Sequence, residues 1–201
     1  MKKSIAVFFV LGSFLILSLV SCSSSPVVTR VDSDTQIDLS GDWNDTDSQL
    51  TAQAMLNDAL SMPWITKFTA TEKKEPKIIV GTVVNRSQEH INTDTFIKEL
   101  QRAITNSGRA QFVASAGQRG EIRAEREDQR TNAADAKRQG QETAADFMLQ
   151  GTINTIFDKE GSREVKYYQV DLQLLNIETN VLVWSGEKKI KKYVAKKKYK
   201  V

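Results

Sequence analysis

Apolar and polar residues alternate along three stretches in the last third of the chain. The stretches cover residues 147–157, 165–177 and 181–194. In the second of them, Val170, Leu172 and Leu174 are separated by single polar residues, as in an antiparallel strand that buries one face. Polar residues at 158–162 and 178–180 supply the turns between the stretches. The pattern therefore predicts three consecutive antiparallel strands, a β-meander.

A helix followed by a buried strand is predicted closer to the N-terminus. The helix begins in the sequence NDTDSQ, where Thr46 and Gln49 have the spacing of a capping box, and runs through LTAQAMLNDAL. We expect it to end before Met62–Pro63, because proline disfavours the helical conformation of the residue before it. Residues 77–85, KIIVGTVVN, form a short run rich in branched apolar side chains, which is typical of a buried strand.

A second helix is predicted between this strand and a further short strand at residues 110–114. Asn92 is its expected N-cap, with Ile91 and Phe96 at the spacing of a hydrophobic staple. Gly108 lies where a C-cap glycine belongs. The residues expected on its inner face are Phe96, Ile97, Leu100 and Ile104.

These elements together predict a fold class. Two parallel strands joined by a helix require a right-handed crossover, which places the helix on one face of the sheet. The predicted class is therefore α/β, a small mixed sheet made of a parallel β-α-β unit and an antiparallel β-meander and covered by helices.

Residues 121–145 have a helical composition but almost no apolar face. A helix that is polar all round is held by ion pairs between its side chains or is only marginally stable. The spacing permits two such pairs, Arg123 with Glu127 and Asp135 with Arg138, each worth roughly 0.2–0.5 kcal/mol. We therefore predict a polar helix that is the least stable element of the fold.

The N-terminus has the pattern of an export signal that ends at the only cysteine of the chain. Two lysines precede an apolar run at residues 5–20, which is shorter than the roughly 20 residues that a membrane-spanning helix needs. LVSC at residues 19–22 resembles a bacterial lipobox, which implies a signal peptide at residues 1–21 and lipid attachment at Cys22. The alternative is an ordinary cleaved signal that leaves an unpaired thiol behind.

Lipidation of this kind implies a stable anchor. Burial of acyl chain contributes about 0.8 kcal/mol per CH₂, so two or more chains hold a protein firmly on a bilayer. In Gram-negative lipoproteins a serine after the cysteine, here Ser23, permits transfer to the outer membrane. We therefore expect an outer-membrane protein that faces the periplasm. Residues 22–37 are the lipidated cysteine and a flexible tether, and residues 38–201 are a single globular α/β domain with a basic C-terminal tail.

The net charge of +3 conceals a strong asymmetry. Residues 32–58 hold seven Asp and no Lys or Arg, whereas residues 187–201 hold eight Lys and one Glu. Such an asymmetry indicates contact with a partner or docking of one segment on another. The basic end has three interpretations. A charged edge strand that resists strand addition is favoured, contact with anionic lipid or cell-wall polymer is the second, and nucleic acid is the weakest because an exported protein rarely meets it.

The sequence contains no GxSxG, HExxH, P-loop or CxxC motif. The single histidine, His90, lies in a polar loop and the single thiol is assigned to lipid, which removes most nucleophile–base arrangements. A pair of catalytic carboxylates stays open. Asp42, Asp45 and Asp47 lack the spacing of a calcium loop and fit helix capping better. Trp43 beside them is expected to pack over the helix start. We therefore predict no catalytic residue, metal ligand or cofactor.

Four segments recur in one order in a known family. They are SGDWNDTDSQL (40–50), VNRSQEHINTDTF (84–96), ADFMLQGTI (145–153) and YYQVDLQLLNIETN (167–180). Together they resemble the LpoB-type outer-membrane lipoproteins, the activators of penicillin-binding proteins. The resemblance implies a domain like the amino-terminal domain of TolB, with no enzymatic activity and no small-molecule substrate. It implies an allosteric activator that reaches through peptidoglycan, docks on a bifunctional penicillin-binding protein and raises glycan polymerisation and crosslinking.

The chain departs from that family in its tether and leaves its docking residues open. The 15 residues from 23 to 37 span at most about 50 Å, whereas understood members carry long, often proline-rich tethers. Loops on a rigid scaffold commonly carry recognition, so Arg86, Gln88 and His90, after the first strand, are the candidate partner-binding residues. Two alternatives remain: a structural or secretion-associated lipoprotein of the curli-export type, and an envelope hydrolase, which the missing motifs disfavour.

Overall fold

The computed structural model describes residues 28–33 and 35–195 of the 201-residue chain. The expected signal peptide, Cys22 and the last six residues lie outside this part. The chain divides into two units, residues 1–35 and residues 36–201. In the first unit the described residues are exposed. The tether and the domain boundary at residue 38 stay predictions. Within the described residues, no helix has the length and hydropathy that crossing a membrane requires.

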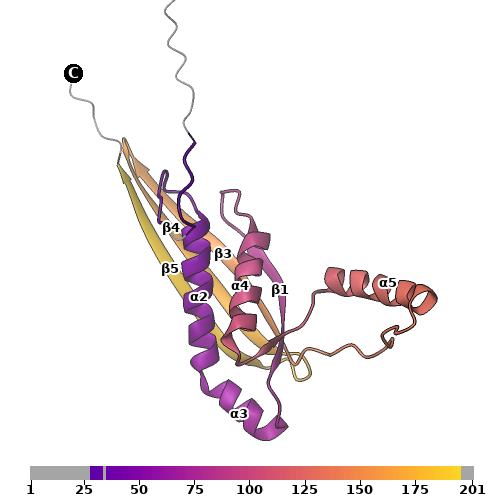
Figure 1. Ribbon diagram of the computed structural model, residues 1–201. Coiled ribbons are helices and arrows are strands. Elements are labelled where there is room, and N and C mark those ends of the chain that lie inside the picture. The colour runs from indigo at the N-terminus through magenta and orange to yellow at the C-terminus, as the bar shows by residue number, and fades with distance from the viewer. Residues whose placement is uncertain (1–27, 34, 196–201) are drawn as a thin grey trace, which may run out of the picture. The chain divides into compact units, whose positions relative to one another are not determined.

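A five-stranded mixed sheet is the framework of the second unit (Figure 1). Its strands, in spatial order, are β2 (Gln111–Phe112), β1 (Lys77–Asn85), β3 (Phe147–Glu160), β4 (Arg163–Asn176) and β5 (Leu182–Ala195). β1 is parallel to both of its neighbours, whereas β3, β4 and β5 are antiparallel to one another. The predicted α/β class, with a parallel β-α-β unit and a β-meander, is therefore confirmed, although β2 is shorter than predicted.

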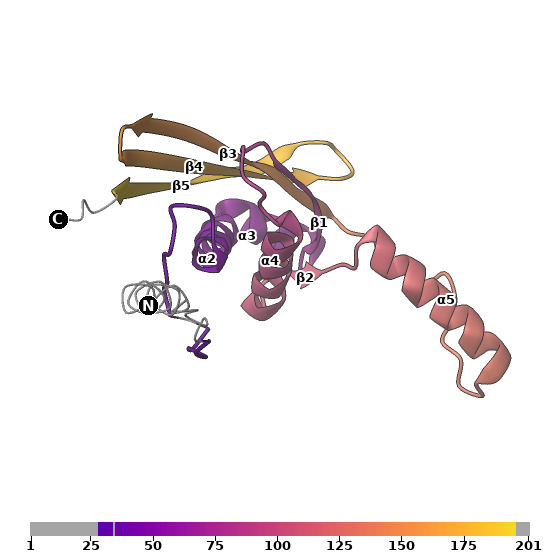
Figure 2. The ribbon, with the colours of Figure 1, turned by 90° about the horizontal axis from the view of Figure 1, so that it is seen from above.

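Three of the four helices in the described residues lie on one face of this sheet. The four are α2 (Asp45–Ser61), α3 (Pro63–Glu72), α4 (Thr93–Ser107) and α5 (Ala116–Asn132). Figure 2 shows α2, α3 and α4 on the same side of the strands, while α5 extends away beyond β2. The core fills the space between α2, α4 and the sheet. The predicted inner face of α4 is confirmed, because Phe96, Leu100 and Ile104 are fully buried and Ile97 packs beside them.

The ends of α4 agree with the prediction and the start of α2 does not. Asn92 caps α4, and Gly108 ends it with a positive φ of 63°. At α2, however, the N-cap is Asn44 and its capping-box partner is Asp47, each side chain accepting the other residue's N–H at 3.0 Å. The predicted box of Thr46 and Gln49 is wrong, because asparagine caps a helix as well as threonine does.

Helix α3 was not predicted. α2 ends at Ser61 as expected, but Pro63 then occupies the first turn of a new helix. Proline is tolerated there because an N–H in the first turn has no hydrogen-bond partner within the helix. Trp64 and Ile65 of this helix are buried against the core. The same proline therefore both ends one helix and begins the next.

The polar helix predicted at residues 121–145 is wrong in its bounds. α5 begins earlier, after a capping box of Ser115 and Gln118, and the chain from residue 133 to residue 146 contains no helix. None of the residues of α5 is buried. The predicted pairs do not form either. Arg123 binds Glu142 on the returning chain instead, at 2.7 Å.

Candidate partner-binding site

The candidate residues lie on the loop that leads from the carboxyl end of β1 to α4. Arg86, Gln88 and His90 are all exposed, while the residues between them are half-buried. This alternation means that the three side chains face solvent and their neighbours face the domain. The structure therefore brings the three predicted residues together on one outward surface. We call residues 85–91 the β1–α4 loop.

Hydrogen bonds within the β1–α4 loop fix its conformation. The N–H and hydroxyl of Ser87 donate to Oδ1 of Asn85 at 2.9 and 2.6 Å, and the Asn85 amide donates to the carbonyl of Glu89 at 2.8 Å. The N–H of Arg86 donates to the carbonyl of Ile153 on β3 at 2.8 Å. A loop that is ordered before it meets a partner loses less conformational entropy on binding.

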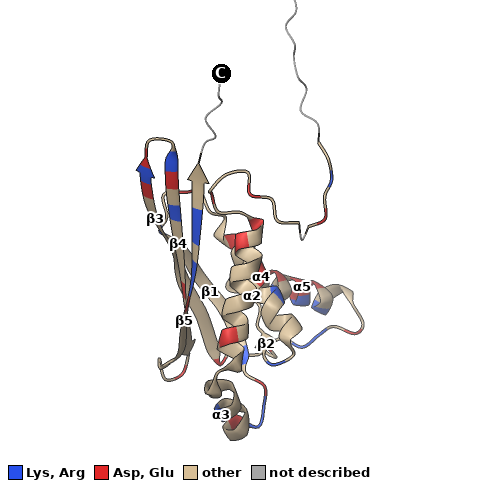
Figure 3. Ribbon diagram, turned by 90° about the vertical axis from the view of Figure 1, so that its left-hand side faces the viewer, with Lys and Arg blue, Asp and Glu red and all other residues tan. Residues whose placement is uncertain are grey.

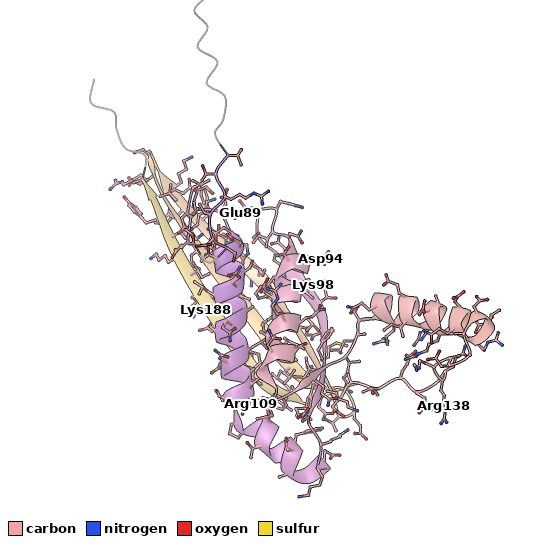
Figure 4. The ribbon with its side chains drawn as sticks, viewed as in Figure 1. Glu89, Asp94, Lys98, Arg109, Arg138 and Lys188 are labelled. Atoms are coloured by element: carbon pink, nitrogen blue, oxygen red, sulfur yellow. The ribbon has the colours of Figure 1, made fainter. Side chains whose placement is uncertain are left out.

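Glu89 connects the β1–α4 loop to the rest of the domain (Figure 4). Its carboxylate accepts the main-chain N–H of Trp43 at 3.1 Å and the ammonium of Lys166 on β4 at 2.8 Å. The hydroxyl of Tyr168 lies 2.8 Å from both Glu89 oxygens and 2.9 Å from the carbonyl of Gly41. One loop carboxylate thus binds β4 and the segment that precedes α2.

That segment, residues 38–44, is here called the acidic strap. It lies against the ends of β4 and β5, where two lysines receive its carboxylates. Lys166 pairs with Asp42 as well as with Glu89, and Glu164 lies 3.5 Å from its ammonium. Figure 3 shows acidic positions at the start of α2 and basic positions along β4 and β5. The acidic and basic ends of the sequence therefore meet within one domain.

Lys192 makes the second set of contacts with the acidic strap. Its ammonium donates to Oδ2 of Asp47 at 2.6 Å, to the carbonyl of Asp42 at 3.0 Å and to Oδ1 of Asp38 at 3.2 Å. Asp47 is also the capping-box residue of α2, so one carboxylate both starts the helix and binds β5. The Lys166 and Lys192 side chains are only 11% and 13% exposed. Charge-assisted hydrogen bonds gain strength when water is largely excluded.

The charged groups between the acidic strap and β4 shift one another's pKa values. The hydrogen bond from Lys166 holds the pKa of Asp42 below its usual value. Burial alone would lower the pKa of Lys166, but its hydrogen bonds and charge interactions with Asp42 and Glu89 outweigh burial and raise that pKa. Burial, and then the neighbouring Glu89 carboxylate, raise the pKa of the Tyr168 hydroxyl. All three groups therefore keep their ordinary ionisation state at neutral pH.

Close packing surrounds the charged groups. The Trp43 ring meets Phe96 and Tyr168 edge to face, with ring centres 6.3 and 5.6 Å apart, and its indole N–H donates to Ser48 at 2.7 Å. Its predicted role as a packing residue over the helix start is confirmed. A Cβ on Gly41 would overlap a methyl group of Val194, so glycine lets the acidic strap approach β5 this closely.

The arrangement offers binding chemistry. Within residues 28–33 and 35–195, no group of three or more His, Cys, Asp or Glu side chains is placed to hold a metal ion. Of the three acidic residues that had suggested a calcium loop, Asp42 and Asp47 bind Lys166 and Lys192 instead. What remains accessible is the outer surface of an ordered loop that carries a guanidinium, an amide and an imidazole.

The two lysines that hold the strap were not predicted from the sequence. The charge asymmetry indicated docking of one segment on another, but it did not identify which residues meet. The alternation of inward and outward residues along β4 and β5 does indicate these two lysines. Lys166 lies two residues before the buried Tyr168, and Lys192 lies two residues after the partly buried Ile190, so each lysine faces the core. A lysine on the buried face of a strand requires a carboxylate partner.

Comparison with protein families assigns the chain to a family. Residues 47–190 match the family model described as peptidoglycan-synthase activator LpoB. This chain therefore belongs to the LpoB family, as the resemblance had implied. No curated protein sequence matches it significantly.

Three solved structures are similar to this chain at low sequence identity. The LpoB C-terminal domain from Escherichia coli is 16% identical, with a TM-score of 0.40, and the match covers 72% of this chain and 98% of that one. The corresponding Salmonella enterica domain has the same identity and coverage and a TM-score of 0.39. Lipoprotein GNA1162 from Neisseria meningitidis is 16% identical over 59% of this chain and 83% of its own, with a TM-score of 0.39.

Proposed function

We propose that this protein binds a bifunctional penicillin-binding protein and raises its activity. The observation that carries the proposal is membership of a family of peptidoglycan-synthase activators over residues 47–190. The domain acts by binding, since the sequence has no catalytic motif. Binding shifts an enzyme between two states only when the ligand prefers one of them. The domain therefore binds the active state of the synthase more tightly than the inactive state.

The β1–α4 loop is the proposed contact surface. Its main chain is fixed by the hydrogen bonds of Asn85 and Ser87, and its side chains at Arg86, Gln88 and His90 are exposed. An arginine and a histidine on an ordered loop suit an acidic or hydrogen-bonding face of a synthase. The network around Glu89 keeps this loop in place when the partner is absent.

Cys22 is the proposed lipid site, and it places the domain on the outer membrane, facing the periplasm. The lipobox-like LVSC at residues 19–22 and the short apolar run before it support this proposal. The anchor supplies location, and the tether sets the local concentration at the synthase. The Cys22→Ala variant should stay unprocessed or leave the membrane fraction. Intact-mass analysis of the membrane form should show an acyl adduct at Cys22, and its absence would disprove the assignment.

The decisive assay mixes the lipid-free unit, residues 36–201, with each bifunctional synthase of the same cell and follows glycan polymerisation from lipid-linked precursor. We expect one synthase to bind it at micromolar concentration and to polymerise faster. If the unit binds none and accelerates none, the activator proposal fails and the export-accessory alternative gains support. Recovery of an outer-membrane pore component from solubilised envelope would favour that alternative.

A charge reversal at the β1–α4 loop tests the contact surface. Arg86→Glu should weaken synthase binding by at least about tenfold, because it places a carboxylate where the proposed partner presents acidic groups. The matched control is Arg109→Glu, which reverses an exposed arginine at the other end of α4 (Figure 4). Both variants should unfold at the wild-type urea concentration. Equal loss of binding in the two variants would remove the loop from the proposal.

A further inference from the structure

The outer edge of β2 is a free edge of the sheet. The N–H groups of Gln111 and Val113 donate to the carbonyls of Pro76 and Ile78, each at 2.9 Å. Successive residues of a strand direct their main-chain groups to opposite sides, so the N–H and C=O of Phe112 point away from β1. Across residues 28–33 and 35–195, no strand pairs with that side of β2. An unpaired edge is a template for adding a further strand.

A groove of about 290 Å³ runs along this edge. Residues 111–114 form one wall, and α5 with the returning chain at residues 141–143 forms the other. Ile122 of α5 lines the groove and is 42% exposed, which leaves an apolar side chain uncovered inside it. The groove therefore combines free main-chain groups with one apolar contact, the two features that an extended peptide recognises on a sheet edge.

The charge of the groove is positive. Arg119 and Arg126 line it together with a single carboxylate, Glu142. Arg123 already binds both oxygens of that carboxylate, at 2.7 and 2.8 Å, and Arg126 donates to one of them at 3.3 Å. The Arg119 guanidinium donates to the carbonyl of Ala114 at 2.8 Å, and within the described residues no carboxylate lies within ion-pair distance of it. The groove thus holds guanidinium groups beyond what its own carboxylate neutralises.

Helix α5 forms one wall of the groove, although it stabilises the core very little. No residue of α5 is buried, and the ion pairs of Arg123 and Arg126 with Glu142 hold it against the returning chain. These contacts keep the second wall of the groove opposite the β2 edge. A helix that is polar all round gains little from burial and relies on its ion pairs.

We propose that this groove binds an extended acidic peptide segment of a partner protein as an added strand on β2. The main chain of the segment pairs with the N–H and C=O of Phe112. A carboxylate of the segment meets Arg119 and Arg126, and an apolar side chain contacts Ile122. Arginine suits this role because its planar group can donate two hydrogen bonds to one carboxylate. The groove lies by the start of β1 and the β1–α4 loop follows its end, so this site is separate from the proposed synthase contact.

The test begins with a probe that makes no assumption about the partner. Random decapeptides displayed on phage are selected on the purified full chain, and the enriched peptides are synthesised. We expect enriched peptides to alternate β-branched residues with Asp or Glu and to bind less tightly as salt rises. Absence of enrichment, or enrichment of peptides without carboxylates, would overturn the proposal.

Amide exchange distinguishes strand addition from simple ion pairing. In the free protein the Phe112 amide should exchange faster than the Val113 amide, whose N–H is bonded to Ile78. A selected peptide should slow exchange at Phe112 by at least about tenfold. Peptide binding without protection of that amide would contradict strand addition.

Three variants separate the parts of the site. Arg119→Gln should weaken peptide binding by at least about tenfold, whereas Arg130→Gln, on the exposed side of α5, should leave it unchanged. Phe112→Pro removes the outward N–H without removing a bond to β1 and should abolish binding, while Phe112→Leu keeps the N–H and the binding. Loss of binding in Phe112→Leu alone, or dimerisation of the free chain through this edge in sedimentation, would overturn the proposal.

Discussion

Two charged regions of this domain differ in how far their ion pairs are buried. At the acidic strap, Lys166 and Lys192 are 11% and 13% exposed and lie beside the packed Trp43 and Tyr168 rings. At α5, Arg123 and Arg130 are 62% and 65% exposed, Arg126 is 20% exposed, and no residue of the helix is buried. Both regions contain short ion pairs, so the difference lies in what surrounds the pairs.

What an ion pair contributes to the stability of a fold depends on how far its charges have left water. An exposed pair typically contributes 0–1 kcal/mol, roughly, because water and salt screen it. Removing one partner of a desolvated pair costs about 3–5 kcal/mol, since the remaining charge loses both its partner and its water. The strap end should therefore be rigid and sensitive to substitution, and α5 should be mobile and tolerant.

Amide exchange should reveal the largest difference between elements. We expect the amides of α5 to exchange at least about a thousandfold faster than those of residues 78–83 in β1, because α5 opens without exposing buried apolar area. Hydrogen–deuterium exchange followed by NMR measures both regions in one sample. Equal protection in the two would contradict the low stability assigned to α5.

Loss of Lys192 should have the largest effect on the free energy of unfolding. Lys192→Met leaves the nearly buried Asp47 without its cation, so we expect a loss of about 2–3 kcal/mol, somewhat below the value for fully buried pairs. The matched control is Lys191→Met, an exposed lysine on the same strand, which should change stability by less than about 0.5 kcal/mol. Urea unfolding measures both. A similar effect of the two substitutions would refute the strap contact.

Two glycine substitutions should change stability in opposite directions. Gly41→Ala forces a methyl group against Val194 and should cost about 1–3 kcal/mol. Gly120→Ala, inside α5 with open space around it, should add about 0.5–1 kcal/mol to the stability of that helix. Urea unfolding measures the first, and helical circular dichroism near 222 nm measures the second. The same sign in both would contradict the difference between the regions.

A smaller effect concerns how stability falls at acidic pH, to which Asp42 contributes. Because Lys166 lowers the pKa of Asp42 in the folded state, the contribution of Asp42 is fully present above its unfolded pKa, about 3.9. It is lost as the pH falls through the lowered folded pKa. Asp42 is 56% exposed, so the contribution should stay below about 1 kcal/mol. Asp42→Asn should flatten stability between about pH 5 and pH 2.5. Parallel wild-type and variant curves would show that the pair contributes nothing.

Local sequence patterns predicted most of the framework. Alternation identified the three long strands, and Asn92 and Gly108 marked the ends of α4, because these signals depend on nearby residues. The errors arose where one residue has two roles. Pro63 ends α2 and also begins α3, and Asn44 caps a helix without matching the Ser/Thr template.

The site was only partly predictable for a different reason. Exposure of Arg86, Gln88 and His90 follows from their place in a polar loop after a strand. The pairing of Asp42 with Lys166 joins residues 124 positions apart in the sequence, and no local pattern specifies such a pair. The predicted ion pair within α5 failed for the same reason, because Arg123 binds Glu142, 19 residues away, and not its helical neighbour Glu127.

The most direct test of the central claim is a footprint of the synthase on this domain. Hydrogen–deuterium exchange is measured on residues 36–201 alone and with whichever bifunctional synthase responds in the polymerisation assay. We predict slower exchange at residues 86–92, where the ordered β1–α4 loop meets the partner, and no change at the same residues when Arg86→Glu replaces the wild type. Protection confined to α5, with the loop unchanged, would contradict the claim that the rigid end of the domain carries recognition.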